Sequence, residues 1–323
     1  MLHPLFLFVS LIPDSGKMED TFDVMIIGGG AAGLTAGIYA SRAKLSTIIL
    51  NDGAVGGQMV LTDEIANYPG VEKTKGFMLA NTMKMQAKSF GCKIRTNVNI
   101  QKYNLEGEIK SVELKDGRSF KAKTVILAPG GKPRSLNIPG EDKFKGTGIS
   151  YCATCDGDFF TDKDLIVVGG GNSALEEAVA LTNFARKVTI VHQFDQFQAF
   201  EHAVQEAKNN PKIDFIMESE LRSFEGDGVL EKVTIEHLPT GKMSEMKIDG
   251  VFIFVGYQPN TEVFKGIVRL NEKGEIPVDA DMKTNIPGVF AAGDCIAKKY
   301  RQVTTAVAEG TVAALSAAEY IRG

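Results

Sequence analysis

Short apolar runs rich in β-branched residues alternate along the chain with longer stretches whose apolar positions recur at helical spacing. The first run, residues 22–27, leads into a glycine-rich segment and a helical stretch that reaches Arg42, and a second run follows at 47–50. Apolar strands that alternate with helices are typical of parallel sheets covered by helices. The pattern predicts a strand, a loop, a helix and a second strand at the start of the chain.

The same order returns in the second half of the chain. An apolar run at 164–168 precedes another glycine-rich segment, a predicted helix through Phe184 and a strand at 187–191. One such unit is weak evidence for a nucleotide site, and ordinary α/β crossovers with glycine turns are the alternative. Two units in the same context favour an α/β protein with two Rossmann-like domains, each doubly wound and built in three layers.

Glycines stand where a dinucleotide-binding turn requires them. Gly28 permits the tight turn, Gly30 lets the backbone approach a pyrophosphate, and Gly33 lets helix and strand pack closely. The pyrophosphate would lie at the helix N-terminus, where unpaired N–H groups favour an anion. The candidate cofactor residues of the two loops are Gly28, Gly30, Ala31 and Gly33 in the first and Gly169, Gly171, Asn172, Ser173 and Ala174 in the second.

The segments between the units predict that the second domain is inserted in the first. Residues 124–127 read as a buried strand that ends in a small-residue turn, and 251–256 lead into a second crossover at 257–260. Residues 288–294 and the small-residue helix after them would complete the first domain. The predicted first domain is 18–132 with 261–323, and the predicted insertion, which carries the cysteine pair, is 133–260.

Composition agrees with a two-domain enzyme that needs no disulfide staples. The 323 residues are 44% hydrophobic, which suffices for two buried cores. Four cysteines, two of them in one motif, are too few for a secreted disulfide framework and favour a reducing, cytoplasmic location. A net charge of -4 leaves no basic surface of the kind that binds nucleic acid.

The first residues of the chain carry its only candidate targeting signal. The apolar run at 5–12 is far shorter than the roughly 20 residues that span a bilayer. No Lys or Arg precedes it, and the residues after it make a poor processing site, so export is not expected. We interpret residues 1–17 either as an upstream extension before Met18 or as an over-long gene start, and in both cases we expect that activity does not require them. We expect no membrane association.

One short segment carries the clearest chemical signal, a Cys-x-x-Cys pair followed by an acid. Two cysteines at this spacing can close and open a small disulfide, and one thiol can stay partly ionised for attack on another disulfide. Asp156, directly after Cys155, offers a proton to a departing thiolate. The alternative is a zinc half-site with Cys152, but zinc needs about four ligands and neither Cys92, Cys295 nor any histidine lies near, so no metal is expected.

With these motifs in place, the chain resembles the low-molecular-weight thioredoxin reductases from about Asp23 to its C-terminus. The match is collinear, and the joint order of its strings carries the resemblance. The strings are the first glycine motif, Gly56-Gly57-Gln58, Asn67-Tyr68-Pro69-Gly70, Cys-Ala-Thr-Cys-Asp, Gly169 to Ala174, Gly293-Asp294 and Tyr300-Arg301-Gln302.

The resemblance implies a homodimeric flavoprotein with FAD in the discontinuous domain and a nicotinamide cofactor in the inserted one. Gln58 and Asn67 would line the isoalloxazine side, and Gln302 with Val303 would approach the ring. Asn51 stands where many flavoproteins carry a ribose-binding acid, and an amide can still bond a hydroxyl. Asp294 would bond ribityl or ribose hydroxyls, and the remaining implied cofactor positions are Gly57, Gly293 and Arg301.

The same resemblance assigns the disulfide chemistry. Cys155 would face the flavin, and Cys152 would attack the disulfide of thioredoxin or a thioredoxin-like protein. Asp156 would supply or accept the proton. In the family the two domains rotate so that the nicotinamide and the disulfide reach the flavin in turn, a movement of the kind that often limits turnover.

One family motif is missing. The family reads NADPH with a His-Arg-Arg-x-x-x-Arg string, because guanidinium groups hold the 2'-phosphate, whereas residues 192–198 here read His-Gln-Phe-Asp-Gln-Phe-Gln. The acid that an NADH enzyme places at the strand end is also missing, since His192 stands there. We expect no preference for NADPH, with NADH or a non-nicotinamide donor such as ferredoxin as the reductant. The sequence leaves open whether Arg186 and Lys187 bind the 2'-phosphate in place of the missing arginines.

Three other functions share parts of this pattern. The flavoprotein of alkyl hydroperoxide reductases carries extra thioredoxin-like domains at its N-terminus, for which residues 1–17 are too short. Ferredoxin-NADP reductases of similar shape lack the cysteine pair. The last alternative is a non-catalytic flavin-binding or regulatory protein that has lost its donor site, which the intact Cys-Ala-Thr-Cys-Asp string disfavours.

Overall fold

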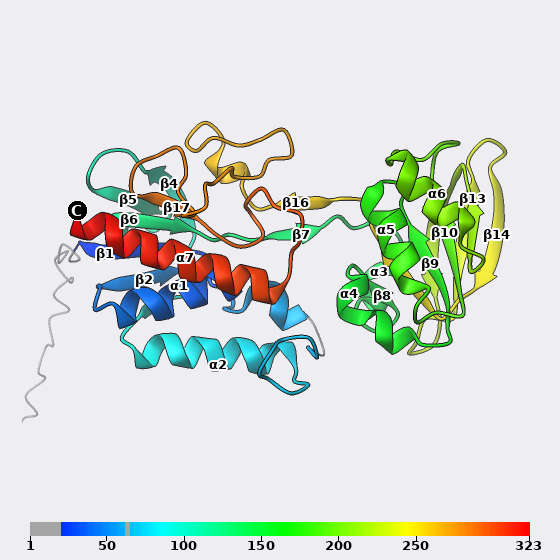
Figure 1. Ribbon diagram of the computed structural model, residues 1–323, viewed down its shortest axis with the longest axis horizontal. Coiled ribbons are helices and arrows are strands. Elements are labelled where there is room, and N and C mark those ends of the chain that lie inside the picture. Colours follow the sequence, from blue (N-terminus) through cyan, green and yellow to red (C-terminus); the bar gives the residue numbers. More distant parts are fainter. Residues whose placement is uncertain (1–20, 62–64) are drawn as a thin grey trace, which may run out of the picture.

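The computed structural model describes residues 21–61 and 65–323, which form two lobes joined by a thin two-stranded connection (Figure 1). The predicted extension 1–17 lies outside the described residues. Each lobe is built on a largely parallel sheet with helices packed against it, so the predicted α/β class with two Rossmann-like domains is confirmed. Within this described part, no helix combines the length and the apolar character needed to cross a membrane.

The first lobe holds a seven-stranded sheet centred on the predicted N-terminal unit. Its strands are β1 (Phe22–Ile27), β2 (Thr47–Leu50), β3 (Lys93–Arg95), β4 (Ile100–Asn104), β5 (Lys110–Leu114), β6 (Ser119–Leu127) and β17 (Val289–Ala291). β1 pairs in parallel with β2 on one side and with β6 on the other, and both predicted strands of this unit are confirmed. β17, from the far end of the sequence, pairs in parallel with β6 and so belongs to the same sheet.

Three helices cover one face of this sheet. They are α1 (Ala31–Arg42), α2 (Gly76–Ser89) and α7 (Val303–Arg322), and α1 contacts both of the others (Figure 1). Val24 and Ile26 of β1 share a buried apolar cluster with these helices, because alternate strand residues point to the same face. A Cβ on Gly310 would lie 2.3 Å from the carbonyl oxygen of Ala32, so glycine is required where α7 crosses α1.

The second lobe repeats the design with a five-stranded parallel sheet and an added antiparallel sheet. The parallel strands are β8 (Ile149–Ser150), β9 (Asp164–Val168), β10 (Lys187–Val191), β11 (Ile213–Ile216) and β15 (Gly250–Ile253). The antiparallel strands are β12 (Ser219–Glu225), β13 (Lys232–His237) and β14 (Lys242–Lys247). The helices are α3 (Glu141–Phe144), α4 (Ala153–Asp156), α5 (Asn172–Leu181) and α6 (Glu201–Asn209), with the 3-10 turn η2 (Gly157–Phe160). The 3-10 turns η1 (Gly57–Leu61) and η3 (Glu262–Phe264) belong to the first lobe.

The helix predicted through Phe184 ends three residues earlier, at Leu181. The Thr182 hydroxyl donates to the carbonyl oxygen of Val179 at 2.6 Å, and the Asn183 amide donates to the next carbonyl in the sequence at 3.1 Å. Side chains that bond nearby backbone in this way compete with the helical ladder, so the chain leaves the helix in a tighter turn.

Two short strands, β7 (Gly131–Pro133) and β16 (Tyr257–Pro259), form the antiparallel ribbon that joins the lobes (Figure 1). The ring of Tyr257 lies against Gly131, where a Cβ would be 2.5 Å from a ring carbon. Gly131 is therefore required for the ribbon to close. Because the ribbon has two strands, few backbone hydrogen bonds hold the lobes in one orientation.

Lys110 in β5 is a charged residue in the core of the first lobe. Its side chain is fully buried, and within the described ranges its Nζ has no hydrogen-bond partner. The Nζ lies 5.6 Å from the ring centroid of Tyr320 on α7. Burial lowers the pKa of Lys110, against an opposing effect of Glu108. The ammonium therefore destabilises the fold at neutral pH, because a cation–π contact replaces only part of its lost hydration.

We predict that Lys110→Met raises the free energy of unfolding by about 1–3 kcal/mol at neutral pH, because it removes an unpaired buried donor and keeps most of the side-chain volume. The pKa of Lys110 is lower in the folded protein than in the unfolded chain. The wild type therefore regains stability as the pH rises from the folded-state pKa to the unfolded-state pKa, because the buried amine loses its charge over that range. The gain from Lys110→Met should shrink over that range. Thermal denaturation at several pH values measures both effects.

Lys102 in β4 provides the matched control, because its side chain is 68% exposed. Lys102→Met should leave the melting temperature nearly unchanged. A melting temperature for Lys110→Met below that of the wild type at neutral pH would contradict this account of the buried ammonium.

Candidate active site

A cavity of about 1480 Å³ opens between the two lobes and is lined by residues of both. Residues 28–32 and 169–174, the two glycine loops, face it, and the cysteine pair lies in its wall. The other predicted cofactor residues in the wall are Asn51, Gly57, Gln58, Asn67, Gly293, Asp294, Arg301, Gln302 and Val303. The sequence-predicted residues are thus gathered around one space, except Gly33, which packs beneath its loop.

Cys152 and Cys155 form a disulfide, with their Cα atoms 5.3 Å apart. The bond spans α4, a single helical turn in which the N–H groups of Cys155 and Asp156 donate to the Cys152 carbonyl at 3.3 and 3.2 Å. The pair is half-buried in the cavity wall. The redox disulfide expected from the spacing is therefore confirmed.

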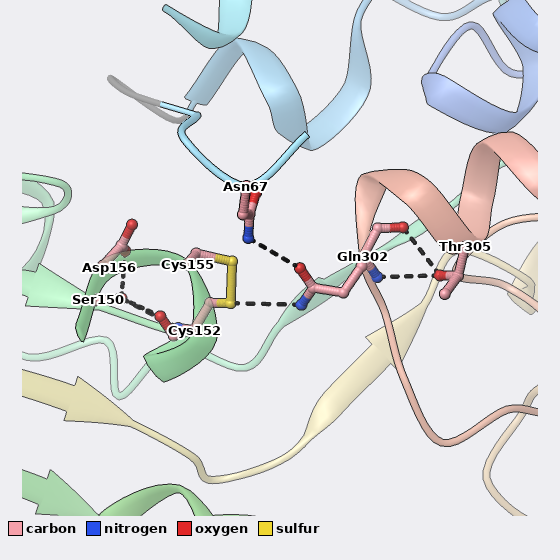
Figure 2. The surroundings of a disulfide bond; sticks show 7 residues. All are labelled: Asn67, Ser150, Cys152, Cys155, Asp156, Gln302 and Thr305. Atoms are coloured by element: carbon pink, nitrogen blue, oxygen red, sulfur yellow. Dashed lines mark hydrogen bonds between the residues drawn. A yellow bond between two sulfur atoms is a disulfide. The ribbon is translucent and has the colours of Figure 1, made fainter. Parts of the chain in front are cut away.

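The Asp156 carboxyl lies beside the disulfide and is held by Ser150. The Ser150 hydroxyl is 2.5 Å from Asp156 Oδ2 and also accepts the Cys152 N–H at 3.1 Å (Figure 2). Burial raises the pKa of Asp156, and the hydrogen bond from Ser150 opposes that rise. An acid whose pKa is raised can carry a proton to a departing thiolate. The sequence analysis missed Ser150, because a serine two residues before the first cysteine carries no distinctive signal.

Gln302 links the other lobe to the disulfide. Its Nε2 donates to Cys152 Sγ at 3.8 Å, and its Oε1 accepts a hydrogen bond from Asn67 Nδ2 at 3.5 Å (Figure 2). Gln302 is also the N-cap of α7, where it and Thr305 exchange capping hydrogen bonds. Of two residues expected on the flavin side of the site, Gln302 therefore contacts a reacting sulfur in this arrangement of the lobes, and Asn67 holds the Gln302 amide.

The first glycine loop leads from β1 into the N-terminus of α1. Gly28 has a φ of +109°, and a Cβ there would lie 2.1 Å from the carbonyl oxygen of Ala128. A Cβ on Gly33 would lie 1.9 Å from the Gly28 carbonyl oxygen, whereas at Gly30 the nearest atom, in Gly57, is 3.9 Å away. The loop is thus tight on its inner side and open toward the cavity, as a pyrophosphate cradle at a helix N-terminus requires.

Asn51 braces this loop. Its Oδ1 accepts the N–H of Gly29 at 2.7 Å, and its Nδ2 donates to the carbonyls of residues 52–54 at 2.9 to 3.2 Å. The amide is therefore engaged with the protein's own backbone, and its part in a cofactor site is to hold the glycine loop in shape.

Three buried polar atoms beside the cavity have no hydrogen-bond partner among the residues that the structure covers: Asp294 Oδ1, Tyr257 Oη and Arg301 Nε. Asp294 Oδ1 lies 3.1 Å from Lys298 Nζ, at an ion-pair distance but outside hydrogen-bond geometry. The Arg301 guanidinium bonds Glu275 and lies 4.4 Å from the Tyr257 ring centroid. Orphaned polar atoms in a cavity wall suit the hydroxyl and phosphate groups of a cofactor. With the glycine loop, they fit FAD.

The second glycine loop leads from β9 into α5, and Gly169 has a φ of +134°. The segment after β10 folds back onto this loop. The Gln198 N–H donates to the Gly170 carbonyl at 2.8 Å, and the Phe200 N–H donates to Asn172 Oδ1 at 2.7 Å. The loop still lines the cavity, so a second pyrophosphate cradle is retained.

His192 directly follows β10 and is almost fully buried. Its ring stacks on Phe197 with centroids 5.6 Å apart, and its Nε2 lies 3.1 Å from the carbonyl oxygen of Gln196. Burial lowers the pKa of His192, so the imidazole is neutral at physiological pH. Gln193 and Gln198 line the cavity beside it. Neutral amides and rings offer no charge to offset a 2'-phosphate.

Arg186 and Lys187 are at the other end of β10, so the possibility that they replace the missing arginines is wrong. Arg186 makes a bidentate pair with Asp164 at 2.6 and 2.9 Å, and Lys187 pairs with Asp214 at 2.5 Å. Lys187 lies five positions before His192 and Arg186 six, or roughly 16 to 20 Å at the usual rise. Although Arg186 and Lys187 are close to His192 in the sequence, the extended strand β10 keeps both away from the cofactor edge.

Arg222 on β12 also lines the cavity, and β12 starts beside His192, whose carbonyl accepts the Ser219 N–H at 2.9 Å. Its guanidinium pairs with Glu220 at 2.7 Å and bonds Glu236. Two carboxylates thus neutralise this cation, which leaves little positive charge for a phosphate.

Cys92 and Cys295 are free and buried, and burial raises the pKa of each thiol to about 12. Thiols that stay protonated at physiological pH are poor nucleophiles, so both are packed residues as expected. In the described ranges, no group of three or more His, Cys, Asp and Glu side chains is placed to hold a metal ion.

Two dinucleotide-type lobes that face each other across a redox disulfide define a disulfide oxidoreductase. A family model described as pyridine nucleotide-disulphide oxidoreductase matches residues 22–310. A 34.2 kDa protein in the rubredoxin operon of Clostridium pasteurianum is 47% identical over 95% of this chain and 99% of its own length. The thioredoxin reductase of Peptoclostridium acidaminophilum is 45% identical over 94% of this chain and 98% of its own.

A solved structure gives the same result. The thioredoxin reductase of Streptococcus pyogenes aligns with a TM-score of 0.89 and 43% identity over 94% of this chain and 98% of that one. The chain therefore belongs to the pyridine nucleotide-disulphide oxidoreductase family and, within it, to the low-molecular-weight thioredoxin reductases.

We predict that the flavoprotein takes up about two electron pairs per subunit in an anaerobic reductive titration, one for FAD and one for the Cys152–Cys155 disulfide. Cys152→Ser should take up one pair, and its flavin should still bleach while thioredoxin reduction is lost. Cys92→Ser, at a buried thiol outside the cavity, is the control and should behave as the wild type. Uptake of a single pair by the wild type would exclude the disulfide as an electron acceptor.

Proposed function

We propose that the protein is an FAD-dependent thioredoxin reductase that passes electrons from a donor through FAD and the Cys152–Cys155 pair to thioredoxin or a thioredoxin-like protein. The observation that carries the proposal is that Gln302 holds the disulfide of one lobe against the proposed flavin side of the other. The division into residues 18–132 with 261–323 and residues 133–260 belongs to the same proposal, and the position of the ribbon β7–β16 supports it.

FAD, when bound, couples two-electron reduction by the donor to the thiol chemistry of the pair. In the reduced pair, the Cys152 thiolate attacks the substrate disulfide and forms a mixed disulfide, and the departing sulfur takes a proton from Asp156. The Asp156 carboxylate then takes the proton of Cys155. The Cys155 thiolate attacks the Cys152 sulfur, restores the enzyme disulfide and releases the second substrate sulfur as a thiolate.

A protein disulfide needs more room at Cys152 than this arrangement of the lobes leaves, since Gln302 already contacts its sulfur. Other contacts across the cavity are an ion pair between Lys299 and Glu176 at 3.8 Å and a cation–π contact of Lys73 with Phe159 at 5.6 Å. Exposed contacts of this kind contribute little stability. Their weakness supports a rotation of the lobes that exposes Cys152 to thioredoxin.

The donor proposal follows from the edge of the second glycine loop. The loop retains a cradle for pyrophosphate, but a neutral His192, Gln193 and Gln198 stand where a 2'-phosphate would need cations. Asp195, three residues after His192, adds a negative charge nearby in the sequence. We therefore propose NADH, or a non-nicotinamide donor such as ferredoxin, as the reductant. The retained glycine loop supports NADH, and the absence of a ribose-binding acid at position 192 supports a non-nicotinamide donor.

Two further features belong to the proposal. Phe77, Met78 and Met85 on α2 are each more than half exposed, and such apolar side chains support the homodimer that the family resemblance implies. The reduced, buried thiols Cys92 and Cys295 support a cytoplasmic location. The rival proposal, a regulatory flavin-binding protein, is disfavoured because the disulfide and its acid are intact in the cavity wall.

We predict that NADPH reduces the bound flavin no faster than NADH at equal concentration in anaerobic stopped-flow measurements. Hydrogen bonds to a charged group contribute about 1.5 to 3 kcal/mol each, so the loss of two or more arginine contacts removes roughly a hundredfold to ten-thousandfold in affinity for the 2'-phosphate. Reduced ferredoxin is tested in parallel. Rapid bleaching at low NADPH, with NADH far slower, would refute this donor assignment.

The triple substitution Gln193→Arg, Phe194→Arg and Gln198→Arg should confer NADPH use if these side chains are the cause. A second triple variant controls for added charge, with arginine at the exposed positions Gln86, Gln101 and Gln205. The control should leave the donor preference of the wild type unchanged.

A further inference from the structure

We propose that Ser150 is a positioning residue for Asp156: its hydroxyl stays bonded to the carboxyl in both protonation states, so the acid can lose and regain one proton in each exchange cycle. The inference rests on the proposed disulfide exchange and adds a residue that none of the sequence motifs marks.

The geometry places Ser150 at the centre of three polar groups. It is the last residue of β8 and is 4% exposed. Its Oγ lies 2.5 Å from Asp156 Oδ2, accepts the Cys152 N–H at 3.1 Å and is 3.4 Å from the Cys152 carbonyl oxygen (Figure 2). The hydroxyl is thereby tied to the backbone at the first cysteine and to the carboxyl that follows the second.

A serine hydroxyl has one proton and two lone pairs, and the Cys152 N–H takes one of the lone pairs. When Asp156 is ionised, the Ser150 proton is donated to Oδ2, the closer of its two acceptors. When Asp156 is protonated, the carboxyl donates to Oγ and the Ser150 proton turns to the Cys152 carbonyl. Every polar group keeps a partner in both states, and no heavy atom has to move.

Electrostatics give this bond a direct effect on the acid. Burial is the main influence and raises the pKa of Asp156, the bond from Ser150 lowers it, and the nearby charge of Asp158 raises it again. Ser150 is the group that favours the carboxylate against two that disfavour it. The charged groups on the surrounding segments are Asp158 on η2, Glu176 and Glu177 on α5, Lys145 before β8, and Lys73 across the cavity.

The proton balance of the exchange uses both states. As the Cys152 thiolate forms the mixed disulfide, the departing substrate sulfur takes the Asp156 proton, and Ser150 donates to the new carboxylate. As the carboxylate takes the Cys155 proton, the Ser150 proton returns to the backbone carbonyl. Without the hydroxyl, Asp156 holds its proton more tightly, and the first transfer slows.

The test compares Ser150→Ala with the wild type in stopped-flow exchange over a range of pH. Enzyme reduced with dithionite, which needs no biological donor, is mixed with bis(2-hydroxyethyl) disulfide, whose alkyl sulfur takes a proton as it leaves at neutral pH, and, separately, with thioredoxin disulfide. We expect the rate at neutral pH to fall by about threefold to tenfold, as loss of one hydrogen bond implies, and the pH profile to move to higher pH. In Asp156→Asn, the part of the pH dependence that comes from titration of Asp156 should be absent.

Ser223→Ala is the matched control, because it removes a serine-to-carboxylate bond of 2.8 Å, to Glu225, outside the cavity. Its profile should coincide with that of the wild type. The pair Ser150→Thr and Ser150→Val separates the hydroxyl from side-chain volume if Ser150→Ala fails to fold, and only Ser150→Thr should keep the wild-type profile.

Coincident pH profiles of wild type and Ser150→Ala, or of Ser150→Thr and Ser150→Val, would overturn the inference. A wild type that reduces the small alkyl disulfide but not thioredoxin would count against the proposed function alone, since the profiles with the alkyl disulfide still decide the role of Ser150. A wild type whose reduced pair exchanges with neither disulfide would overturn both.

Discussion

The reacting sulfurs belong to one lobe, while the side chains that fit a flavin belong to the other, and the rest of the structure depends on holding the two together. The contact that does so is the hydrogen bond from Gln302, at the start of α7, to Cys152 Sγ. Asn67 fixes the Gln302 amide from a separate segment of the same lobe. A thin ribbon and a few exposed contacts complete the link, so the disulfide is placed near the flavin site without being fixed there.

The inserted lobe shows how two halves of one binding site can diverge. Its glycine loop depends on backbone shape, which Gly169 provides with a positive φ. The adjoining edge depends on side-chain charge, and there His192 is buried and neutral and the Arg222 guanidinium is bound by two carboxylates, which leaves little positive charge for a phosphate. The glycine loop can keep its conformation although the adjoining edge lacks cations, because the loop also serves packing between β9 and α5.

Elements with strong apolar periodicity were predictable from the sequence. The strands at 22–27, 47–50, 164–168 and 187–191 have these same bounds in the structure, because each is an apolar run buried in a parallel sheet. The cysteine pair was predictable because its chemistry depends on local spacing.

Features that depend on three-dimensional neighbours were not predictable. The end of α5 depends on side-chain bonds to the backbone, and the failure of Arg186 to reach the cofactor edge depends on which end of β10 it occupies. Ser150 and Tyr257 gain their importance from groups that the fold brings beside them, Asp156 and Arg301. Neither residue type, read along the chain, indicates such a partner.

The most direct test of the account is to trap the covalent intermediate with thioredoxin. A thioredoxin with a single active-site cysteine, activated as a mixed disulfide with an aromatic thiol, is mixed with reduced Cys155→Ser and reduced Cys152→Ser, and the products are mapped by mass spectrometry. The account predicts a stable complex through Cys152 in the Cys155→Ser variant and little complex in the other. Preferential trapping at Cys155, or no complex with either variant, would contradict it.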